Sequence, residues 1–474
     1  MPIPPRSYGS AKIRAHRSFV ARRLVLPTQG FFHTEGPGGV LLLASAVAAL
    51  ALANSPWGGW FARCLEAHLA VEVGRFSLRG DLRDLIDDGL MTVFFYVVGL
   101  EIKREIVEGD LSSPRKAALP VLAALGGMVV PALLYAACNL GGPGARGWGV
   151  PMATDIAFSV GVLILLGDRV PGPIRVFLLA LAIADDIGAI LVIALFYSRG
   201  ISFEALGVAA AVLAAMGLMI RGGVRSSNAY LVASLAFWAA MLRSGVHATL
   251  AGVILGAMTP LRPWFSLYSF SRPAGRLLRR FERALGLGDF DRAEAMLGQM
   301  EELSRGTESQ LDRRLRQVHP WSSYAVLPLF ALANSGVALT AESLGRAGSS
   351  GITWGIVLGL VVGKPLGILG FARLAVALRV ASPPEGATWS EVAGAGMVAG
   401  IGFTVSLFVA GLAFTDPAEV VDAKIGVLAA SILAGAIGFA FLRARPRPSG
   451  RELAGAAVAA DPARPAPLPE EIAR

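Results

Sequence analysis

Twelve apolar runs constrain the fold of this chain more than any other feature of its sequence. A helix needs about 20 predominantly apolar residues to cross a bilayer. A segment in hydrocarbon must also satisfy its own backbone hydrogen bonds, which favours helix over open sheet. The sequence therefore predicts an all-α polytopic membrane protein with about twelve transmembrane helices, several of them short or interrupted by glycine and proline. The runs are 40–53, 85–100, 117–140, 148–166, 176–197, 201–220, 229–242, 246–258, 325–339, 352–376, 392–414 and 425–442.

The composition agrees with a membrane protein and excludes several other classes. Of the 474 residues, 54% are hydrophobic and 16% are charged, whereas a soluble domain carries about 25% charged residues. The net charge of +9 lies in tails and loops rather than on one face, so neither a soluble enzyme nor a nucleic-acid-binding protein is expected. Cys64 and Cys138 are too few for a disulfide framework, and no Cys/His cluster indicates zinc or haem. We therefore expect no cofactor.

Lysine and arginine are unevenly distributed between the two sets of loops. The loops opposite the N-terminus mostly hold one basic residue each, except the first, which holds several. Because cytoplasmic loops are enriched in basic residues, this bias predicts that both termini are cytoplasmic. The basic residues on the predicted cytoplasmic side are Lys103, Arg104, Arg115, Lys116, Arg169, Arg175, Arg221, Arg225, Arg373 and Arg379.

The chain divides into three parts by composition. Residues 1–35 form a basic, proline-broken cytoplasmic extension, residues 36–442 form the transmembrane domain, and residues 443–474 form a disordered tail rich in alanine, proline and charge. Within the domain, 261–319 is a long cytoplasmic loop with helix-like leucine and methionine spacing. The N-terminal region also resembles a signal peptide ending at Ala51-Leu52-Ala53, but its basic part is longer than usual, so a retained first helix is favoured.

The first predicted outer loop has an alternating apolar pattern on both sides of Gly74-Arg75. Such alternation around a glycine is typical of a short β-hairpin. A solvated loop explains the pattern equally well, so the sequence leaves both readings open. The alternating residues are Leu69, Val71, Val73, Phe76 and Leu78.

The informative ionisable residues inside the apolar runs are Asp155, Asp185, Asp186 and Lys364. A charge at the centre of a bilayer costs at least about 2.5–3.5 kcal/mol on insertion scales, so each needs a reason. A buried Asp–Lys pair that merely holds two helices together would explain one aspartate and Lys364. It would leave the second of the adjacent aspartates without a role.

Adjacent aspartates suit an exchange of protons for cations. Neighbours on a helix point about 100° apart, so Asp185 could pair with a cation while Asp186 faces a cavity. Two carboxylates in a low dielectric cannot both be charged cheaply, so they share protons as a unit. A monovalent cation with oxygen ligands could replace those protons, which is the chemical basis of an antiporter.

Helix breakers occur at corresponding places in two halves of the chain. Gly149 and Pro151 precede Thr154-Asp155, and Gly400-Ile401-Gly402 interrupts the eleventh run. Interrupted segments of this kind point to a transport site at the middle of the membrane.

Other functions explain fewer of these features. The string Gly286-Leu287-Gly288-Asp289 matches the GxGD motif of intramembrane aspartyl proteases, but it lies in a polar loop. A proton-conducting subunit of a larger energy-converting complex is the main alternative, and it predicts charged residues across many spans rather than at one place. A passive channel would need a ring of carboxylates or carbonyls.

Seven strings, falling in order between Gly36 and Leu442, resemble the NhaA family of bacterial Na⁺/H⁺ antiporters. Their order makes the resemblance more specific than any single string. The strings are Val98–Glu105, Ala153–Phe158, Asp185-Asp186, Ser244–Gly252, His319–Trp321, Gly363–Gly367 and Gly400–Thr404.

The resemblance implies roles for the membrane-embedded residues. Asp186 would be the principal cation-binding carboxylate, Asp185 its partner in proton exchange, and Lys364 the cation paired with Asp185. Asp155 and Thr154 would lie where two broken helices of an inverted-repeat fold cross near the midplane. Family members in the bacterial inner membrane export Na⁺ or Li⁺ for two protons per cation, and the resemblance suggests a homodimer formed through the first outer loop. Whether Li⁺, Na⁺ or K⁺ is preferred is not fixed by the sequence.

The resemblance also assigns a set of residues to the response to pH. For Glu101, Lys103 and Arg104 a solvated helix end is the equal alternative, and for His247 an ordinary hydrogen-bonded histidine. The family's acidic and histidine positions before His319 are Leu315 and Arg316 here, which puts the pH profile in doubt. The pH-response candidates are Glu101, Lys103, Arg104, His247 and His319.

Overall fold

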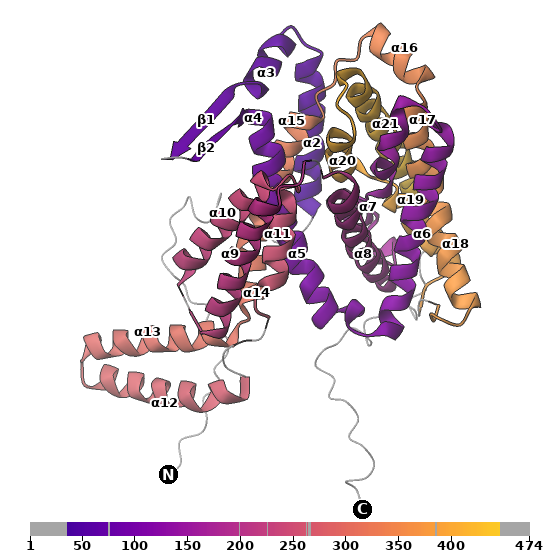
Figure 1. Ribbon diagram of the computed structural model, residues 1–474. Coiled ribbons are helices and arrows are strands. Elements are labelled where there is room, and N and C mark those ends of the chain that lie inside the picture. The colour runs from indigo at the N-terminus through magenta and orange to yellow at the C-terminus, as the bar shows by residue number, and fades with distance from the viewer. Residues whose placement is uncertain are drawn as a thin grey trace, which may run out of the picture.

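The computed structural model describes residues 36–73, 76–198, 200–224, 226–261, 263, 267–383 and 386–445 (Figure 1). Each of the twelve apolar runs contains helix in this part of the chain, so the predicted helical architecture is confirmed. The predicted N-terminal extension and nearly all of the predicted disordered tail lie outside the described residues. The helices from the first half are α2 Gly36–Ala53, α3 Gly58–Leu65, α4 Leu82–Asp84, α5 Met91–Val107, α6 Pro114–Cys138, α7 Ile156–Leu166, α8 Gly172–Phe196, α9 Phe203–Arg221, α10 Ser227–Arg243 and α11 Thr249–Met258.

The second half of the chain is helical as well. Three π-helical segments, Leu85–Leu90, Ser322–Val326 and Gly359–Gly363, extend neighbouring α-helices without a break. The remaining helices are α12 Leu267–Gly286, α13 Phe290–Thr307, α14 Gln310–Trp321, α15 Leu327–Asn334, α16 Ala341–Ser349, α17 Gly351–Leu358, α18 Lys364–Ala377, α19 Trp389–Ala399, α20 Phe403–Ala413 and α21 Pro417–Arg443.

Five continuous helices among the described residues are long and apolar enough to cross a membrane, and three bent pairs raise that number to eight. Two of the bent pairs are Pro143–Met152 with α7, at 44°, and α19 with α20, at 49°. The remaining helices are shorter or, like α12 and α13, too polar, so the number of about twelve spans stays a prediction. Of the long helices, α8 is the most buried inside the protein. In α8, 67% of an apolar stretch of 18 residues is buried, against 11% in α9.

The first predicted outer loop is a β-hairpin. The sequence alone fitted a hairpin and a solvated loop equally well. Strand β1, His68–Val73, pairs antiparallel with β2, Phe76–Asp81, and the register joins His68 to Asp81 and Val73 to Phe76. The turn residues between them lie outside the described part. The hairpin projects from the side of the helical bundle (Figure 1).

The polar stretch 261–319 forms two antiparallel helices, α12 and α13, followed by α14. The protease-like GxGD string falls in the turn of this hairpin, where Asp289 accepts a hydrogen bond from the Arg292 backbone N–H at 3.2 Å and caps α13. An N-cap aspartate is the ordinary use of this residue at a helix start. Leu311 is fully buried with Leu100 and Leu261, so α14 is fixed to one end of α5.

Glycines let α5 and α11 approach to backbone contact. A Cβ atom on Gly256 would lie 2.6 Å from the Tyr96 carbonyl oxygen, and a Cβ atom on Gly99 would lie 2.6 Å from the Val253 carbonyl oxygen. Gly252 and Gly256 form a GxxxG spacing, which is typical of closely packed membrane helices. Without a hydrophobic driving force between helices in lipid, this close packing is what holds the pair together.

We expect Gly256→Val to destabilise the protein, because the side chain has no space between the two backbones. Overpacking costs about 1–3 kcal/mol or more, measurable as a lower thermal unfolding midpoint in detergent. The control is Gly207→Val in α9, where an added Cβ atom meets nothing within 4 Å. Equal midpoints for the two variants would contradict this account of the α5–α11 contact.

Candidate functional site

The two bent helices meet at their breaks. Residues Ala153 to Asp155 join the 3₁₀ helix Pro143–Met152 to α7, and Gly400 to Gly402 join α19 to α20. The Asp155 backbone N–H donates to the Ile401 carbonyl at 2.7 Å, and the Thr154 hydroxyl donates to the Ala399 carbonyl at 2.9 Å. Each break therefore satisfies backbone groups of the other, as non-helical backbone at membrane depth requires.

The Asp155 carboxylate lies at the N-termini of two helices at once. Its Oδ1 atom accepts the Phe158 backbone N–H at 2.9 Å, which caps α7. Its Oδ2 atom accepts the Thr404 backbone N–H at 3.1 Å and the Thr404 hydroxyl at 2.6 Å, at the start of α20. Helix N-termini carry positive partial charge, so one buried carboxylate is attracted to both.

Lys364, in contrast to Asp155, lies at a helix C-terminus, which carries negative partial charge. Its Nζ atom donates to the Met152 carbonyl, at the C-terminal end of the 3₁₀ helix, and to Asp185 Oδ2 at 2.6 Å. The side chains of Lys364 and Asp185 are both fully buried. This is a charge-assisted hydrogen bond between fully buried groups, where electrostatic attraction is strongest.

Asp186 differs from its neighbour Asp185 on α8, whose Oδ2 atom is paired with Lys364. Asp186 is 4% exposed, and its Oδ2 atom, like Oδ1 of Asp185, is buried without a hydrogen-bond partner among the described residues. Burying a charged oxygen without a partner is costly, so this oxygen suits a group that binds a proton or a cation. Asp185, Glu101 and Asp155 contribute negative charge around Asp186, and Lys364 contributes positive charge.

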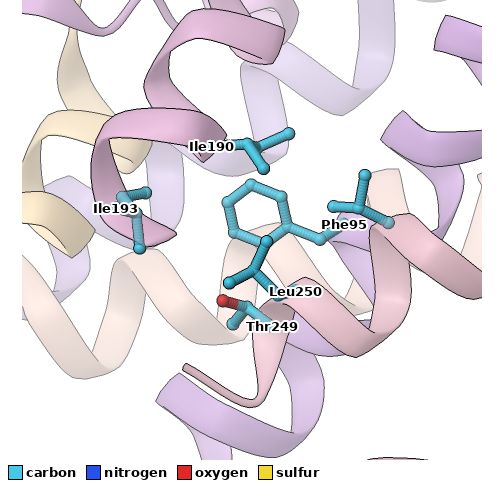
Figure 2. A pocket seen from close by; sticks show the side chains of 6 residues that line it. Phe95, Ile190, Ile193, Thr249 and Leu250 are labelled. Carbon is cyan, nitrogen blue, oxygen red and sulfur yellow. The ribbon is translucent and has the colours of Figure 1, made fainter. Parts of the chain in front are cut away.

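A narrow apolar crevice borders the same face of α8 as Asp186. Ile190 and Ile193 follow Asp186 by four and seven residues, which is one side of a helix. They point toward Phe95 of α5 and toward Thr249 and Leu250 of α11 (Figure 2). Apart from the threonine hydroxyl, this lining offers no ligand for a cation, so on this side the carboxylate is bounded by apolar packing.

Two of the pH-response candidates, Lys103 and Arg104, lie where α5 approaches α11 and α14. The Lys103 Nζ atom donates to the carbonyls of Ala257 at 2.7 Å and Thr259 at 2.6 Å, which caps the C-terminus of α11. Arg104 Nε lies 3.7 Å from Asp312 Oδ1. The reading of Lys103 as a solvated helix end is therefore incomplete, because its ammonium group joins two helices.

The two histidine candidates lie apart from each other. His319 Nε2 lies 3.8 Å from Glu101 Oε1, so these two candidates face each other. His247 instead has its ring centroid 6.2 Å from that of Phe408, in an edge-on contact.

Thr404 was not among the predicted site residues, although it ends the Gly400–Thr404 string that resembles the family. Its hydroxyl is buried and bonded to Asp155. The signal was a hydroxyl residue two positions after the glycine break. Ser159 and Ser406 act similarly, donating to the carbonyls of Val398 at 3.1 Å and Val150 at 2.8 Å across the two bent helices.

Comparison with known proteins gives one consistent result. A family model described as Na⁺/H⁺ antiporter 1 matches residues 29–442. Na(+)/H(+) antiporter NhaA 2 of Sorangium cellulosum is 47% identical over 91% of this chain and 92% of its own length. Na(+)/H(+) antiporter NhaA of an Anaeromyxobacter strain is 45% identical over 95% and 96%, and that of Shigella dysenteriae is 43% identical over 88% and 98%.

We expect Lys364→Met to destabilise the protein strongly, because it leaves Asp185 buried without its cation. Removing one partner of a buried pair costs about 3–5 kcal/mol, and thermal unfolding in detergent measures the loss. Adding Asp185→Asn to Lys364→Met should recover part of it. The control is Arg316→Met, which breaks a surface pair with Glu308 and should cost no more than about 1 kcal/mol. Similar losses for the two single variants would contradict the buried pair.

Proposed function

Since the chain belongs to the NhaA family of Na⁺/H⁺ antiporters, and is therefore a multi-pass membrane transporter rather than an enzyme, we propose that it exchanges the two ions at Asp185 and Asp186. Family membership supports sodium/proton exchange and leaves the proton-conducting subunit without support. The observation that carries the proposed site is the buried Asp186 oxygen without a partner, beside the Asp185–Lys364 pair.

The charge balance explains how two ions compete. Asp185, Asp186 and Lys364 hold two carboxylates against one ammonium group, within a buried region. With both carboxylates ionised, one negative charge is left over, which a monovalent cation neutralises. With protons on the carboxylates the cation has no charged ligand, so proton binding and cation binding exclude each other. In this scheme Na⁺ or Li⁺ is the transported ion, and Asp186 and Asp185 bind it transiently.

The exchange is electrogenic in this proposal. Two protons enter for each cation that leaves, so one net positive charge moves inward per cycle. Alternating access would come from movement of the inverted repeats around the crossing of the two bent helices. Asp155, Thr154 and Thr404 keep that crossing intact, and about twelve spans would surround it.

The loop charges and the family support a proposal for the cellular location and orientation. We place the protein in the bacterial inner membrane with both termini cytoplasmic, where export of Na⁺ or Li⁺ serves pH homeostasis. The loop 261–319 would then be cytoplasmic, as would residues 1–35 and 443–474. Lipids and a second copy of the chain, joined through the β-hairpin, are the partners in this scheme.

The response to pH needs no separate sensor. Competition between protons and cations at Asp185 and Asp186 makes apparent cation affinity rise with pH and then level off, once the carboxylates are deprotonated. Contacts such as His319 with Glu101 would only adjust the midpoint of that transition, as would His247.

The first test is Asp186→Asn, which should abolish Na⁺-dependent proton movement in proteoliposomes while the protein stays folded. An amide can neither release a proton nor offer a charged oxygen. Asp185→Asn should be nearly as severe. Asp416→Asn is the control, because Asp416 caps α21 and asparagine caps a helix equally well. Wild-type exchange in the Asp186 variant would overturn the proposed site.

Membrane potential tests the stoichiometry. If one net charge crosses per cycle, transport at zero pH gradient should respond to an imposed potential, since each elementary charge feels about 2.3 kcal/mol per 100 mV. Proteoliposomes clamped with valinomycin and K⁺ measure this directly. A rate that is indifferent to the clamped potential would indicate electroneutral exchange.

His247→Ala tests the competition model. We expect the variant to keep the maximum rate and to shift the pH profile modestly, because competition at the two carboxylates sets the profile in this model and His247 packs its ring against Phe408. Dye-based proton efflux measured at a series of pH values with Na⁺ and Li⁺ gives both quantities. Loss of transport at every pH in a well-expressed, folded variant would show that His247 belongs to the exchange machinery.

A further inference from the structure

The hairpin formed by α12 and α13 buries only part of its apolar surface. The two helices pack against each other, and the most buried residues are Ala284 and Ala293, at 7% and 4% exposure. Four half-buried side chains lie on the same side of their helices as these two alanines. They are Leu277, Phe281, Met296 and Met300.

Five large apolar side chains of the hairpin are nevertheless open to solvent. Leu278 and Leu285 on α12 are 45% and 44% exposed, Phe290 and Leu297 on α13 are 72% and 50% exposed, and Leu287 in the turn is 76% exposed. We call these five residues the apolar side of the hairpin. An exposed group of this kind marks an interaction surface in an otherwise polar element.

The residues of the apolar side that lie on the helices face the same way. At about 100° per residue, Leu278 and Leu285 lie roughly 80° from the residues of α12 that contact α13. Phe290 and Leu297 lie roughly 80° from the contact residues of α13, in the same rotational sense. In an antiparallel pair, equal rotations of the same sense point to the same side. The apolar side is therefore one continuous flank of the hairpin.

The rest of the hairpin surface is charged, and its charges nearly cancel. Residues 267–307 hold seven arginines and six acidic residues, a net charge of 7 − 6 = +1. Five of the arginines fall within roughly a 100° arc of α12 that faces away from the apolar side. They are Arg272, Arg276, Arg279, Arg280 and Arg283. An anionic bilayer surface would favour a more basic hairpin, with its arginines beside the apolar residues.

The position of the hairpin indicates what covers its apolar side. In Figure 1, α13 lies between α12 and the end of the bundle, so the hairpin stands on edge and its apolar side faces sideways. A bilayer would meet its edge, whereas a neighbouring copy in the same membrane would meet its flank. The hairpin also projects beyond the bundle on the same side of the view as β1–β2.

We propose that the apolar side of the α12–α13 hairpin binds the same surface of a second copy, forming a four-helix bundle outside the membrane. Two copies inserted in one membrane share their orientation, so their twofold axis runs along the membrane normal and their hairpins lie at the same level. A twofold interface uses one surface twice, which suits an apolar flank bordered by polar residues. Two helix pairs packed in this way make the common four-helix arrangement. The interface is independent of the exchange mechanism.

Single cysteines test the contact in native membranes. In a Cys64→Ser, Cys138→Ser background, Leu285→Cys and Leu297→Cys should give a covalent dimer with a flexible bis-maleimide. Arg276→Cys and Ala295→Cys are the matched controls, because both positions are exposed and lie off the apolar side. Since apposed cysteines react at a high effective concentration, we expect roughly tenfold more dimer at the first pair than at the controls.

A second variant separates the contact from random collision. Leu278→Glu combined with Phe290→Glu should remove the Leu297→Cys cross-link while leaving Na⁺/H⁺ exchange unchanged. Equal cross-linking at all four cysteine positions would overturn the proposal. So would quenching of a fluorophore on Leu285→Cys by brominated lipid, because the apolar side would then face the bilayer.

Discussion

One buried carboxylate, that of Asp155, accounts for how the two bent helices can meet. Two helix N-termini pointing at one place would repel each other, because each carries positive partial charge. Asp155 accepts hydrogen bonds from the starts of α7 and α20 and places a negative charge between them. The hydroxyls of Thr154 and Ser159 satisfy carbonyls at the end of α19. Broken backbone is tolerated here because the opposite break supplies its missing partners.

Asp155 is hydrogen-bonded at that crossing. Of the four charged residues predicted from the sequence, this leaves the Asp185–Lys364 pair and Asp186 by itself. Lys364 is bonded to both Asp185 and the Met152 carbonyl, so its charge is shared between a carboxylate and a helix C-terminus. Asp186 has no such neighbour at its Oδ2 atom among the described residues. A purely structural ion pair would need only Asp185 and Lys364. The second aspartate costs stability unless something binds it, which is why its position supports a transport role more than a packing role.

The sequence predicted elements better than contacts. Long apolar runs predicted the helices because length and hydrophobicity are local properties. Charge inside an apolar run is also a local property, and it singled out Asp155, Asp185, Asp186 and Lys364 as candidate site residues. Which aspartate pairs with Lys364 depends on the packing of residues 179 apart in sequence, and the resemblance rather than the pattern assigned it. Thr404 was missed because a threonine in an apolar run is unremarkable until its partner is known. The alternating pattern at 69–78 fitted a hairpin and a loop equally well. A strand forms only where another strand pairs with it, and the pattern does not show that pairing.

The pH-response candidates at the end of α5 can be interpreted from the packing of that helix. Glycine contacts join α5 to α11 along its length, and Lys103 caps α11 from the end of α5, so these two helices form one mechanical unit. That unit supplies Phe95, Thr249 and Leu250 to the crevice beside Asp186 (Figure 2). The Glu101–His319 contact links the same end of α5 to α14. In the proposed mechanism, a change of charge there would act on a closely packed pair of helices whose other residues border the crevice beside Asp186, and would alter access without contacting the ions.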